Sequence, residues 1–467
     1  MTYSLIKKFL IYFYGFKHKI FGKYQYDSIS RKFLDIIKNN ALLSLQDYTR
    51  TLQNSIFNFS SEHPFINSYK SKILFNISPQ KAAMEIRNFE IIKQKWLKQN
   101  SKFKSNYDYL PFEKVAGAIG NYSELFNYLN YRYNIENKNS KPKIIIADRK
   151  QITNPYLFKY FQNYIELIES PKYFNQMKFI SEVNKVAIDV ASLFNGKYYP
   201  HHFATNFVNQ ELKKTNDKKF KKFKISTDDY VHGYKNLKKF GITQKDWYVL
   251  FHIRDGKGDE YRNSNPETYI KAMKYVINKG GWAIRVGRFE KFKFPKITGL
   301  LDYSFSNIAS DRMDIFLAAT CKFCVATSSG FAPIPKYFGR PVLLTNCIPI
   351  SAYLELDKND IFLPKKFYHD KSNKLIEFKN NFSFPTNYFN SPVIFKKNNI
   401  KFSNNSEEDL KLATEEMFNL NSNSPKESFL NKNKLFKDKL QNDLKMDFEF
   451  PLSHECNFSE SVINSYI

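Results

Sequence analysis

Two short segments of the chain combine residue types that suit the binding of a phosphate group. The first is the apolar run 248–254, in which His252 and Arg254 lie two positions apart at the end. Side chains alternate along a strand, so both would point to one face at its carboxyl end, where a guanidinium can bind a diphosphate through two parallel hydrogen bonds. The second is the turn 327–330, whose hydroxyls and backbone N–H groups would form a neutral cradle for a phosphate. A helix cap and a buried structural histidine are the alternative interpretations.

The elements that must position these residues alternate between strands and helices. Apolar runs bounded by turns predict strands, and apolar residues three and four positions apart predict amphipathic helices. This alternation is typical of a parallel, doubly wound sheet, which binds ligands at the carboxyl ends of its strands. The predicted strands are 248–254, 282–287, 299–303, 323–326 and 339–344, and the predicted helices are 266–279, 311–319 and 331–338.

Outside this part, the pattern predicts further regions of different kinds. Length suggests two or three domains, and an aromatic content of 17% supplies ample material for packed cores. Strands at 143–148 and 164–168 predict a first α/β region before the clearer second one. The predicted regions are a helical N-terminal region (1–110), a first α/β domain (111–210), a second α/β domain (225–400), and a C-terminal part (401–467) with a helix at 406–420, a flexible segment at 421–445 and a last stretch, 457–467, that docks back on a domain.

The positive charge of the chain is weak evidence for an anionic partner. The formal charge is 72 minus 45, or +27, but Lys, Asn, Ile and Phe are abundant throughout, as expected when base composition biases residue choice. The segment 211–224 contains seven lysines and joins the two α/β regions. A solvated linker is the favoured interpretation, and a patch that binds lipid or nucleic acid is the alternative.

Four cysteines are too few for a disulfide framework in 467 residues, and they predict a reducing compartment. Cys321 and Cys324 have the spacing of a metal or redox pair, but no second Cys or His pair lies nearby, so two buried structural thiols are favoured. No run reaches the ~18 apolar residues of a membrane-spanning helix. The basic, aromatic stretch 4–17 suits either an anionic membrane surface or a helix packed on the first domain.

The sequence contains no Walker loop, no Gly-x-Gly-x-x-Gly fingerprint and no Asp-x-Asp pair that would hold a divalent metal. We therefore predict no metal and no cofactor. Protein cations and helix dipoles would then have to neutralise the charge of a bound diphosphate. The candidate cations are Arg254, Arg262, Arg285 and Arg288.

The order of these motifs resembles a family of bacterial glycosyltransferases of GT-B type and is more distantly similar to the fucosyltransferase-like enzymes. The resemblance is strongest from Trp247 to Asn346 and weaker elsewhere. It depends on the order of the motifs more than on any one of them. The motifs that carry it are His252-Ile253-Arg254, Tyr261-Arg262-Asn263, the run 281–287, Asp302-Tyr303, the run 311–317 and Thr327-Ser328-Ser329-Gly330.

This resemblance implies a GT-B-like fold, in which two doubly wound Rossmann-type domains face a cleft, with the helical N-terminal region added. It implies that Arg254 binds the diphosphate of a nucleotide sugar with His252 beside it as the catalytic pair. The residues implied to bind the donor are Ser328, Ser329 and Gly330 at the phosphate or distal sugar, Arg285 and Gly287 on the nucleotide side, and Asp302 and Asp314 at the ribose or base. Asp314 could equally face solvent on its helix. Where many GT-B enzymes have a ribose-binding glutamate this chain has Phe331-Ala332-Pro333, which leaves the nucleotide open.

The sequence thus predicts metal-independent transfer of a sugar from a nucleotide diphosphate sugar to a glycan, surface-polysaccharide or lipid-linked acceptor. The expected location is cytoplasmic, with peripheral attachment to the inner face of a membrane as a further expectation. The 111–210 domain would hold the acceptor and the 225–400 domain the donor. The base is undecided among His201, His202, Asp148, Asp259 and Glu260. Polysaccharide pyruvyl transfer is the alternative reaction, and a non-catalytic basic protein that binds nucleic acid is disfavoured because no recognition motif accompanies the charge.

Overall fold

The computed structural model describes most of the chain from residue 119 onwards. The helical region predicted at 1–110 lies outside this part, as does the stretch 4–17. The described residues are 119–146, 148–169, 191–194, 197–216, 218–256, 260–288, 291–382, 395–396, 398–422, 424–443 and 455–466.

By their internal contacts, the residues of the chain fall into two compact units. Unit 1 consists of Met1–Pro111 and Ser170–His201, and unit 2 consists of Phe112–Glu169 and His202–Ile467. All residues of the predicted donor site belong to unit 2. The domain boundaries proposed from the sequence stay a prediction. The described strands of unit 1 are an antiparallel pair, β3 (Ala191–Phe194) and β4 (Lys197–Pro200).

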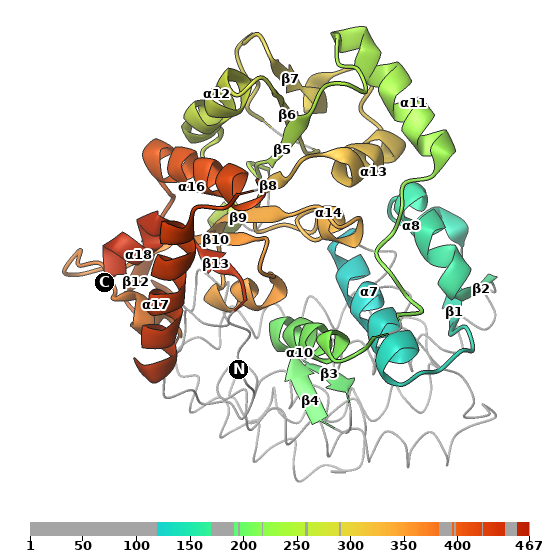
Figure 1. Ribbon diagram of the computed structural model, residues 1–467, viewed down its shortest axis with the longest axis horizontal. Helices are drawn as coiled ribbons and strands as arrows, with labels where there is room; N and C mark the ends of the chain where they lie inside the picture. Colours follow the sequence, from blue (N-terminus) through green and yellow to red (C-terminus); the bar gives the residue numbers. More distant parts are fainter. Residues whose placement is uncertain are drawn as a thin grey trace, which may run out of the picture. The chain divides into compact units, whose positions relative to one another are not determined.

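Unit 2 contains a sheet of seven parallel strands (Figure 1). Neighbouring strands lie in the order β7, β6, β5, β8, β9, β10, β13. Every residue of β5, β8, β9 and β10 is buried, as expected for parallel strands covered on both faces. The strands are β5 (Tyr248–His252), β6 (Trp282–Val286), β7 (Leu300–Asp302), β8 (Cys324–Thr327), β9 (Val342–Cys347), β10 (Ile361–Pro364) and β13 (Asn457–Phe458).

The order of the strands reverses once, between β5 and β8. From β5 the chain adds β6 and then β7 on one side, crosses back, and adds β8, β9 and β10 on the other side. Doubly wound sheets bind their ligands at such a reversal, because the loops after the two central strands lead away in opposite directions. The predicted α/β class and doubly wound parallel sheet are confirmed. The two predicted phosphate-binding segments follow the two strands that flank the reversal.

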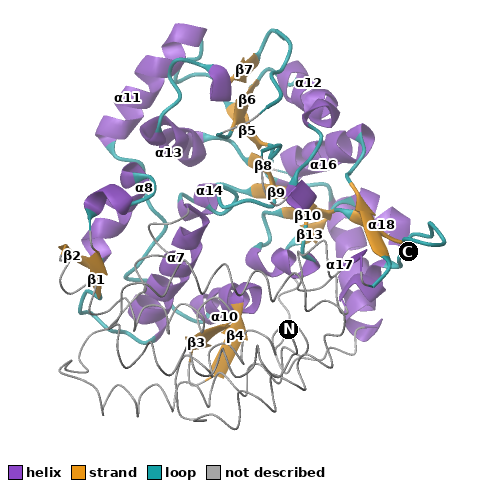
Figure 2. Ribbon diagram, turned by 180° about the vertical axis from the view of Figure 1, so that it is seen from behind, coloured by secondary structure: helices purple, strands orange, loops and turns teal. Residues whose placement is uncertain are grey.

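Helices pack on both faces of this sheet, and Figure 2 shows the two layers from behind. α12 and α16 pack on each other over β6 and β9, while α13 and α14 lie together on the other face. Both faces of the sheet are therefore shielded from solvent, which matches the continuous apolar runs of the strands. The helices are α12 (Ile270–Asn278), α13 (Asp311–Thr320), α14 (Ile334–Tyr337) and α16 (Glu407–Leu420).

Local sequence explains where these helices begin. Ser310 Oγ accepts a hydrogen bond from Met313 N (3.3 Å) at the start of α13, and a reciprocal capping box that includes Ser406 opens α16, as predicted. α14 is shorter than the predicted helix 331–338. Pro333 and Pro335 lack the N–H groups that would bond the carbonyls four residues earlier, so a turn replaces the first part of that helix.

Residues 119–169 also belong to unit 2, and an aromatic cluster joins them to the later chain. Phe126 stacks on Tyr337 with ring centroids 4.5 Å apart and meets Phe220 edge-on at 5.1 Å. Within 119–169 the elements are α7 (Tyr122–Asn130), α8 (Pro155–Phe161) and the parallel pair β1 (Lys143–Ile146) and β2 (Glu166–Glu169). Later in the chain come α10 (His201–Lys213), α11 (Thr227–Leu237) and the antiparallel pair β11 (Lys366–His369) and β12 (Ile400–Ser403).

The C-terminal part corrects one prediction and confirms two others. The segment 421–445 was predicted to be flexible, but most of it forms α17 (Glu427–Asp443), so this prediction was wrong. Phe429 and Phe436 of α17 are buried, and Phe436 packs on Phe458 of β13 (5.2 Å between centroids); the intervening Lys and Asn residues concealed this stripe. The helix at 406–420 is confirmed as α16. The docking of the last residues is also confirmed, through β13 and α18 (Glu460–Tyr466).

All four cysteines of the chain are free and buried. This finding confirms Cys321 and Cys324 as structural thiols. Burial raises the pKa of Cys321 to about 12, so the reactive thiolate does not form at neutral pH. Among the helices of the described residues, none is long and apolar enough to cross a bilayer.

A buried carboxyl group, Glu416 on α16, makes the stability of unit 2 depend on pH. Its Oε1 accepts a hydrogen bond from Glu460 N (2.9 Å) at the start of α18. Burial raises the pKa of Glu416 from 4.5 to about 8. The folded state therefore keeps a proton that the unfolded state releases between these two values.

We expect the free energy of unfolding to fall as the pH rises from about 4.5 to about 8. A raised folded-state pKa stabilises below the unfolded value, and this stability is lost through the folded value. Each pKa unit corresponds to about 1.4 kcal/mol, which makes the loss on the order of a few kcal/mol. Glu416→Gln should flatten the dependence in urea titrations at several pH values. Glu415→Gln, which removes an exposed pair with Lys411 (3.9 Å), is the control. Parallel losses in wild type and Glu416→Gln would contradict the assignment.

Candidate active site at the reversal of strand order

One buried hydroxyl joins the carboxyl ends of β5 and β8. The strands pair in parallel with His252 opposite Ala326. Thr327 Oγ1 accepts a hydrogen bond from Arg254 N (3.1 Å) and donates to His252 O (3.4 Å). Arg254 and the 327–330 turn, 73 residues apart in sequence at the Thr327 contact, are therefore held side by side, as the sequence predicted.

His252 lies in the interior of this site as a neutral imidazole. Its Nδ1 is 3.2 Å from Ser329 Oγ, and its ring stacks on Phe331 with centroids 5.1 Å apart and planes 9° apart. Burial, followed by the positive charge of Arg285, lowers the pKa of His252 to about 4. The ring is thus uncharged at neutral pH and can share one proton with Ser329.

The loop after Arg254 folds back over the end of β8. Ser264 N donates to Arg254 O (2.8 Å), and Arg262 Nε donates to Ser328 O (3.0 Å). Arg262 thereby bridges the loop after β5 and the turn after β8. Arg254 and Arg262 both help to lower the pKa of His252, which places two guanidinium groups near one point of the sheet edge. Arginine is the side chain best suited to bind a phosphate there.

Lys365 is a third cation, which binds the loop after β5 from another strand. The sequence analysis did not identify it. It directly follows β10, and its Nζ donates to Asn263 O and to Asn404 Oδ1, each at 2.7 Å. Burial lowers the pKa of Lys365 to about 8. A cation directly after an apolar run was the available signal, as with Arg254. The run 361–364 is short and ends in proline, so it was not recognised as a strand.

Ser328 and Ser329 already use their hydroxyl groups within the protein. Ser328 Oγ donates to Ile348 O (3.0 Å), and Ser329 Oγ accepts from Phe331 N (3.2 Å). A hydroxyl has a single proton, so Ser328 can donate to a phosphate only by releasing Ile348 O. Their predicted role at a phosphate or distal sugar stays a prediction.

Gly330 lies directly against the backbone of Gly120. A Cβ on Gly330 would lie 2.6 Å from Gly120 N and 2.8 Å from Gly120 Cα, and a Cβ on Gly120 would lie 2.8 Å from Gly330 Cα. Real Cβ atoms are not found so close to backbone atoms, so neither position has room for a side chain. The two glycines bring the short helical turn Ile119–Asn121 next to the 327–330 turn.

Arg285 and Asp302 form a buried ion pair at the ends of β6 and β7. Arg285 Nη1 donates to Asp302 Oδ1 (3.1 Å), while Asp302 Oδ2 accepts from Phe294 N (2.9 Å). Arg285 is 0% exposed, so a nucleotide could reach it only if the residues that shield it from solvent moved. Gly287 follows β6 with a φ of 148°, a value that favours glycine. The donor-binding roles predicted for these three residues stay predictions.

Asp314 faces inward, so the alternative that it faces solvent was wrong. It is buried on α13 and accepts hydrogen bonds from Arg288 Nη2 (2.9 Å) and Tyr303 OH (2.8 Å). Burial raises the pKa of Asp314. Arg288 also pairs with Asp311. These bonds occupy both carboxylate oxygens and explain the burial of Asp314 without a ligand.

No general base is identified among the five candidates. Asp148 accepts a hydrogen bond from Lys150 N (2.8 Å) and caps a turn. Asp259 and the side chains of His201, His202 and Glu260 lie outside the part of the chain that the structure describes. Within that part, no group of three or more His, Cys, Asp or Glu side chains is placed to hold a metal ion.

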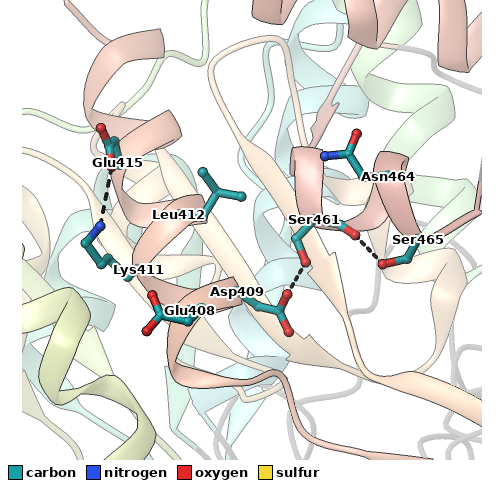
Figure 3. A pocket seen from close by; sticks show the side chains of 8 residues that line it. All are labelled: Glu408, Asp409, Lys411, Leu412, Glu415, Ser461, Asn464 and Ser465. Carbon is teal, nitrogen blue, oxygen red and sulfur yellow. Dashed lines mark hydrogen bonds and ion pairs between the residues drawn. The ribbon is translucent and has the colours of Figure 1, made fainter.

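A separate pocket of about 420 Å³ lies between α16 and α18 (Figure 3). Its carboxylates are engaged within the protein, since Asp409 accepts from Ser461 and Glu415 faces Lys411. None of its residues belongs to the site at the strand reversal, and we assign it no ligand. The lining residues are Glu408, Asp409, Lys411, Leu412, Glu415, Ser461, Asn464 and Ser465.

No protein-family model and no curated protein matches the chain. Solved structures that are similar to it include the following three. A glycosyl transferase of family 9 from Veillonella parvula DSM 2008 is 14% identical, with 64% of this chain and 94% of that chain covered and a TM-score of 0.39. E. coli ADP-heptose lps heptosyltransferase II is 12% identical over 48% and 67% of the chains (TM-score 0.24), and E. coli heptosyltransferase WaaC with ADP is 9% identical over 54% and 89% (TM-score 0.29). None of the three is named a fucosyltransferase. The similarities are too distant to assign an activity, so we infer the function from the site itself.

We expect the imidazole of His252 to stay uncharged between pH 5 and pH 8, because its pKa is lowered to about 4. An NMR titration of the histidine ring protons tests this, with His252→Gln assigning the resonance by its loss. A midpoint near the ordinary histidine value of ~6.5 would show that the ring is open to solvent and not held against Ser329.

We expect Gly330→Ala and Gly120→Ala each to lower the melting temperature and to weaken ligand binding at the site. Each added Cβ must displace a backbone, and neither change removes a polar group. Because the clash is reciprocal, similar losses in the two single variants would confirm it. A Gly330→Ala protein with wild-type melting temperature would contradict the close approach.

Proposed function

We propose that the chain is a glycosyltransferase that takes its sugar from a nucleotide diphosphate sugar at the β5–β8 reversal. The observation that carries this proposal is the convergence of Arg254, Arg262 and the 327–330 turn at the single reversal of strand order. A diphosphate is a compact, multiply charged anion, and guanidinium groups bind it through paired, charge-assisted hydrogen bonds. The resemblance of these motifs to GT-B enzymes supports the same assignment.

In the proposed reaction Arg254 binds the diphosphate and stabilises it as it leaves. Thr327 and Ser264 hold the N–H and the C=O of Arg254, so its side chain projects from a fixed backbone. Cations fixed before the reaction stabilise developing charge without a cost of reorganisation. Together with Arg262, Arg254 would neutralise the departing nucleotide diphosphate without a metal.

His252 is proposed to position the turn and not to remove a proton. A group with a pKa of about 4 is a weak base at neutral pH. Its contact with Ser329 and its stacking on Phe331 suit it to hold the 327–330 turn at a fixed distance from Arg254. This assignment replaces the directly catalytic role expected from the sequence.

The acceptor is proposed to be a glycan or a lipid-linked glycan, which would meet the first α/β region in a GT-B arrangement. Surface-polysaccharide assembly at the cytoplasmic face of a membrane is the setting that the resemblance suggests. A base for an inverting reaction would come from the first α/β region or from the loop after β5.

Arg254→Ala is the test of this function. Purified protein is mixed with GDP-, UDP-, ADP-, CMP- and dTDP-sugars, with and without EDTA, and thermal stabilisation and release of free nucleotide are recorded. We expect one nucleotide class to stabilise the protein independently of EDTA, and Arg254→Ala to weaken this binding about ten- to hundredfold, the contribution of a hydrogen bond to a charged group.

Arg340→Ala is the matched control, because Arg340 lies before β9 at the opposite edge of the sheet, where its Nε donates to Ala319 O (2.7 Å). Retention of nucleotide-sugar turnover by Arg254→Ala would refute the proposed site. Consumption of phosphoenolpyruvate without any response to nucleotide sugars would reassign the protein to pyruvyl transfer. Binding of nucleic acid without any response to nucleotide sugars or phosphoenolpyruvate would favour the alternative of a non-catalytic basic protein.

A further inference from the structure

The lysine-rich segment between α10 and α11 is fixed in place by its two phenylalanines. Phe223 N donates to Tyr337 O (2.7 Å), and Asn134 bonds both the N–H and the C=O of Phe220 (2.9 and 2.8 Å). Phe220 meets Tyr164 edge-on with centroids 4.6 Å apart. We name residues 218–224 the lysine strap. Its backbone is held at two points, so it is not a loose linker.

Four of the five strap lysines are exposed and Lys218 is half-buried, because the two phenylalanines face inward. Phe220 and Phe223 are three residues apart and both buried. The exposed lysines are Lys219, Lys221, Lys222 and Lys224.

The strap lysines differ from the lysines at the end of α10 and just after it in having no ion pair among the described residues. Lys213 pairs with Glu455 (2.6 Å) and Lys214 with Glu211 (2.6 Å). In the strap, Lys219 donates only to an amide oxygen, Asn139 Oδ1 (2.9 Å). The charge of Lys222 is one of the smaller influences that lower the pKa of Asp357, and this carboxylate already accepts from Lys336 (3.4 Å).

We propose that the lysine strap is a docking surface for an anionic lipid bilayer. Lysine is a compact point charge that suits a diffuse array of headgroups, and the strap contains no arginine, whose planar fork suits recognition of single phosphates or bases. Single-stranded nucleic acid is disfavoured, because both aromatic rings are buried and none is left to stack on a base. The attraction needs no conformational change, since the strap is held before it meets the surface.

Vesicle co-sedimentation of the full chain tests the proposal without any donor or acceptor, so its outcome is independent of the proposed glycosyltransferase activity. We expect binding to vesicles that contain phosphatidylglycerol, no binding to phosphatidylcholine alone, and weakening by salt. The test variant carries Gln at Lys219, Lys221, Lys222 and Lys224. Each lysine near an anionic surface contributes a factor of about five, so the four changes should weaken binding at least tenfold.

The matched control removes the same charge from exposed lysines on and after α11, by Gln at Lys235, Lys238, Lys239 and Lys245. The control should bind vesicles as wild type does, and both variants should melt as wild type does, since Phe220 and Phe223 are unchanged. Equal weakening by both variants would show that net charge alone acts and would overturn the proposal. A strap variant that binds vesicles normally but loses binding to duplex DNA would also overturn it, in favour of nucleic acid.

Discussion

The parallel pairing of β5 with β8 is the constraint on which the site depends. These two strands flank the reversal of strand order, and the register of their pairing brings their carboxyl ends level with each other. A shift of one residue in this pairing would turn His252 to the opposite face, because side chains alternate. Such a shift would also force the packing on both faces to change, since all residues of both strands are buried. The hydroxyl of Thr327 adds a bond that only the observed register permits.

Burial at this edge of the sheet has two effects that act in opposite directions. It removes water from His252 and Lys365 and so disfavours their charged forms. It also lowers the local dielectric, which strengthens the attraction between Arg254 or Arg262 and any anion that arrives. Because like charges gathered in one place repel one another, an anionic ligand would stabilise the folded state as it binds.

Local patterns in the sequence were sufficient for most of the sheet. Apolar runs, helix caps such as Ser406 and the polar ends of two strands are all contained in short windows, and they predicted the strands that flank the reversal. Contacts between distant residues were not predictable in this way. Lys365 bonds Asn263, which lies 102 positions away in sequence. Nothing in the sequence around Arg285 shows that it will pair with Asp302. In α17 the abundance of Lys and Asn, a property of the whole chain, masked a real apolar stripe.

The burial of every cysteine has a practical consequence for spectroscopy. Cys321, Cys324, Cys347 and Cys456 are all inaccessible in the folded protein, so maleimide reagents should leave the native chain unmodified. A single cysteine introduced at an exposed position would then be the sole reactive group. A fluorophore or spin label could therefore be attached at a chosen place without first removing the native thiols.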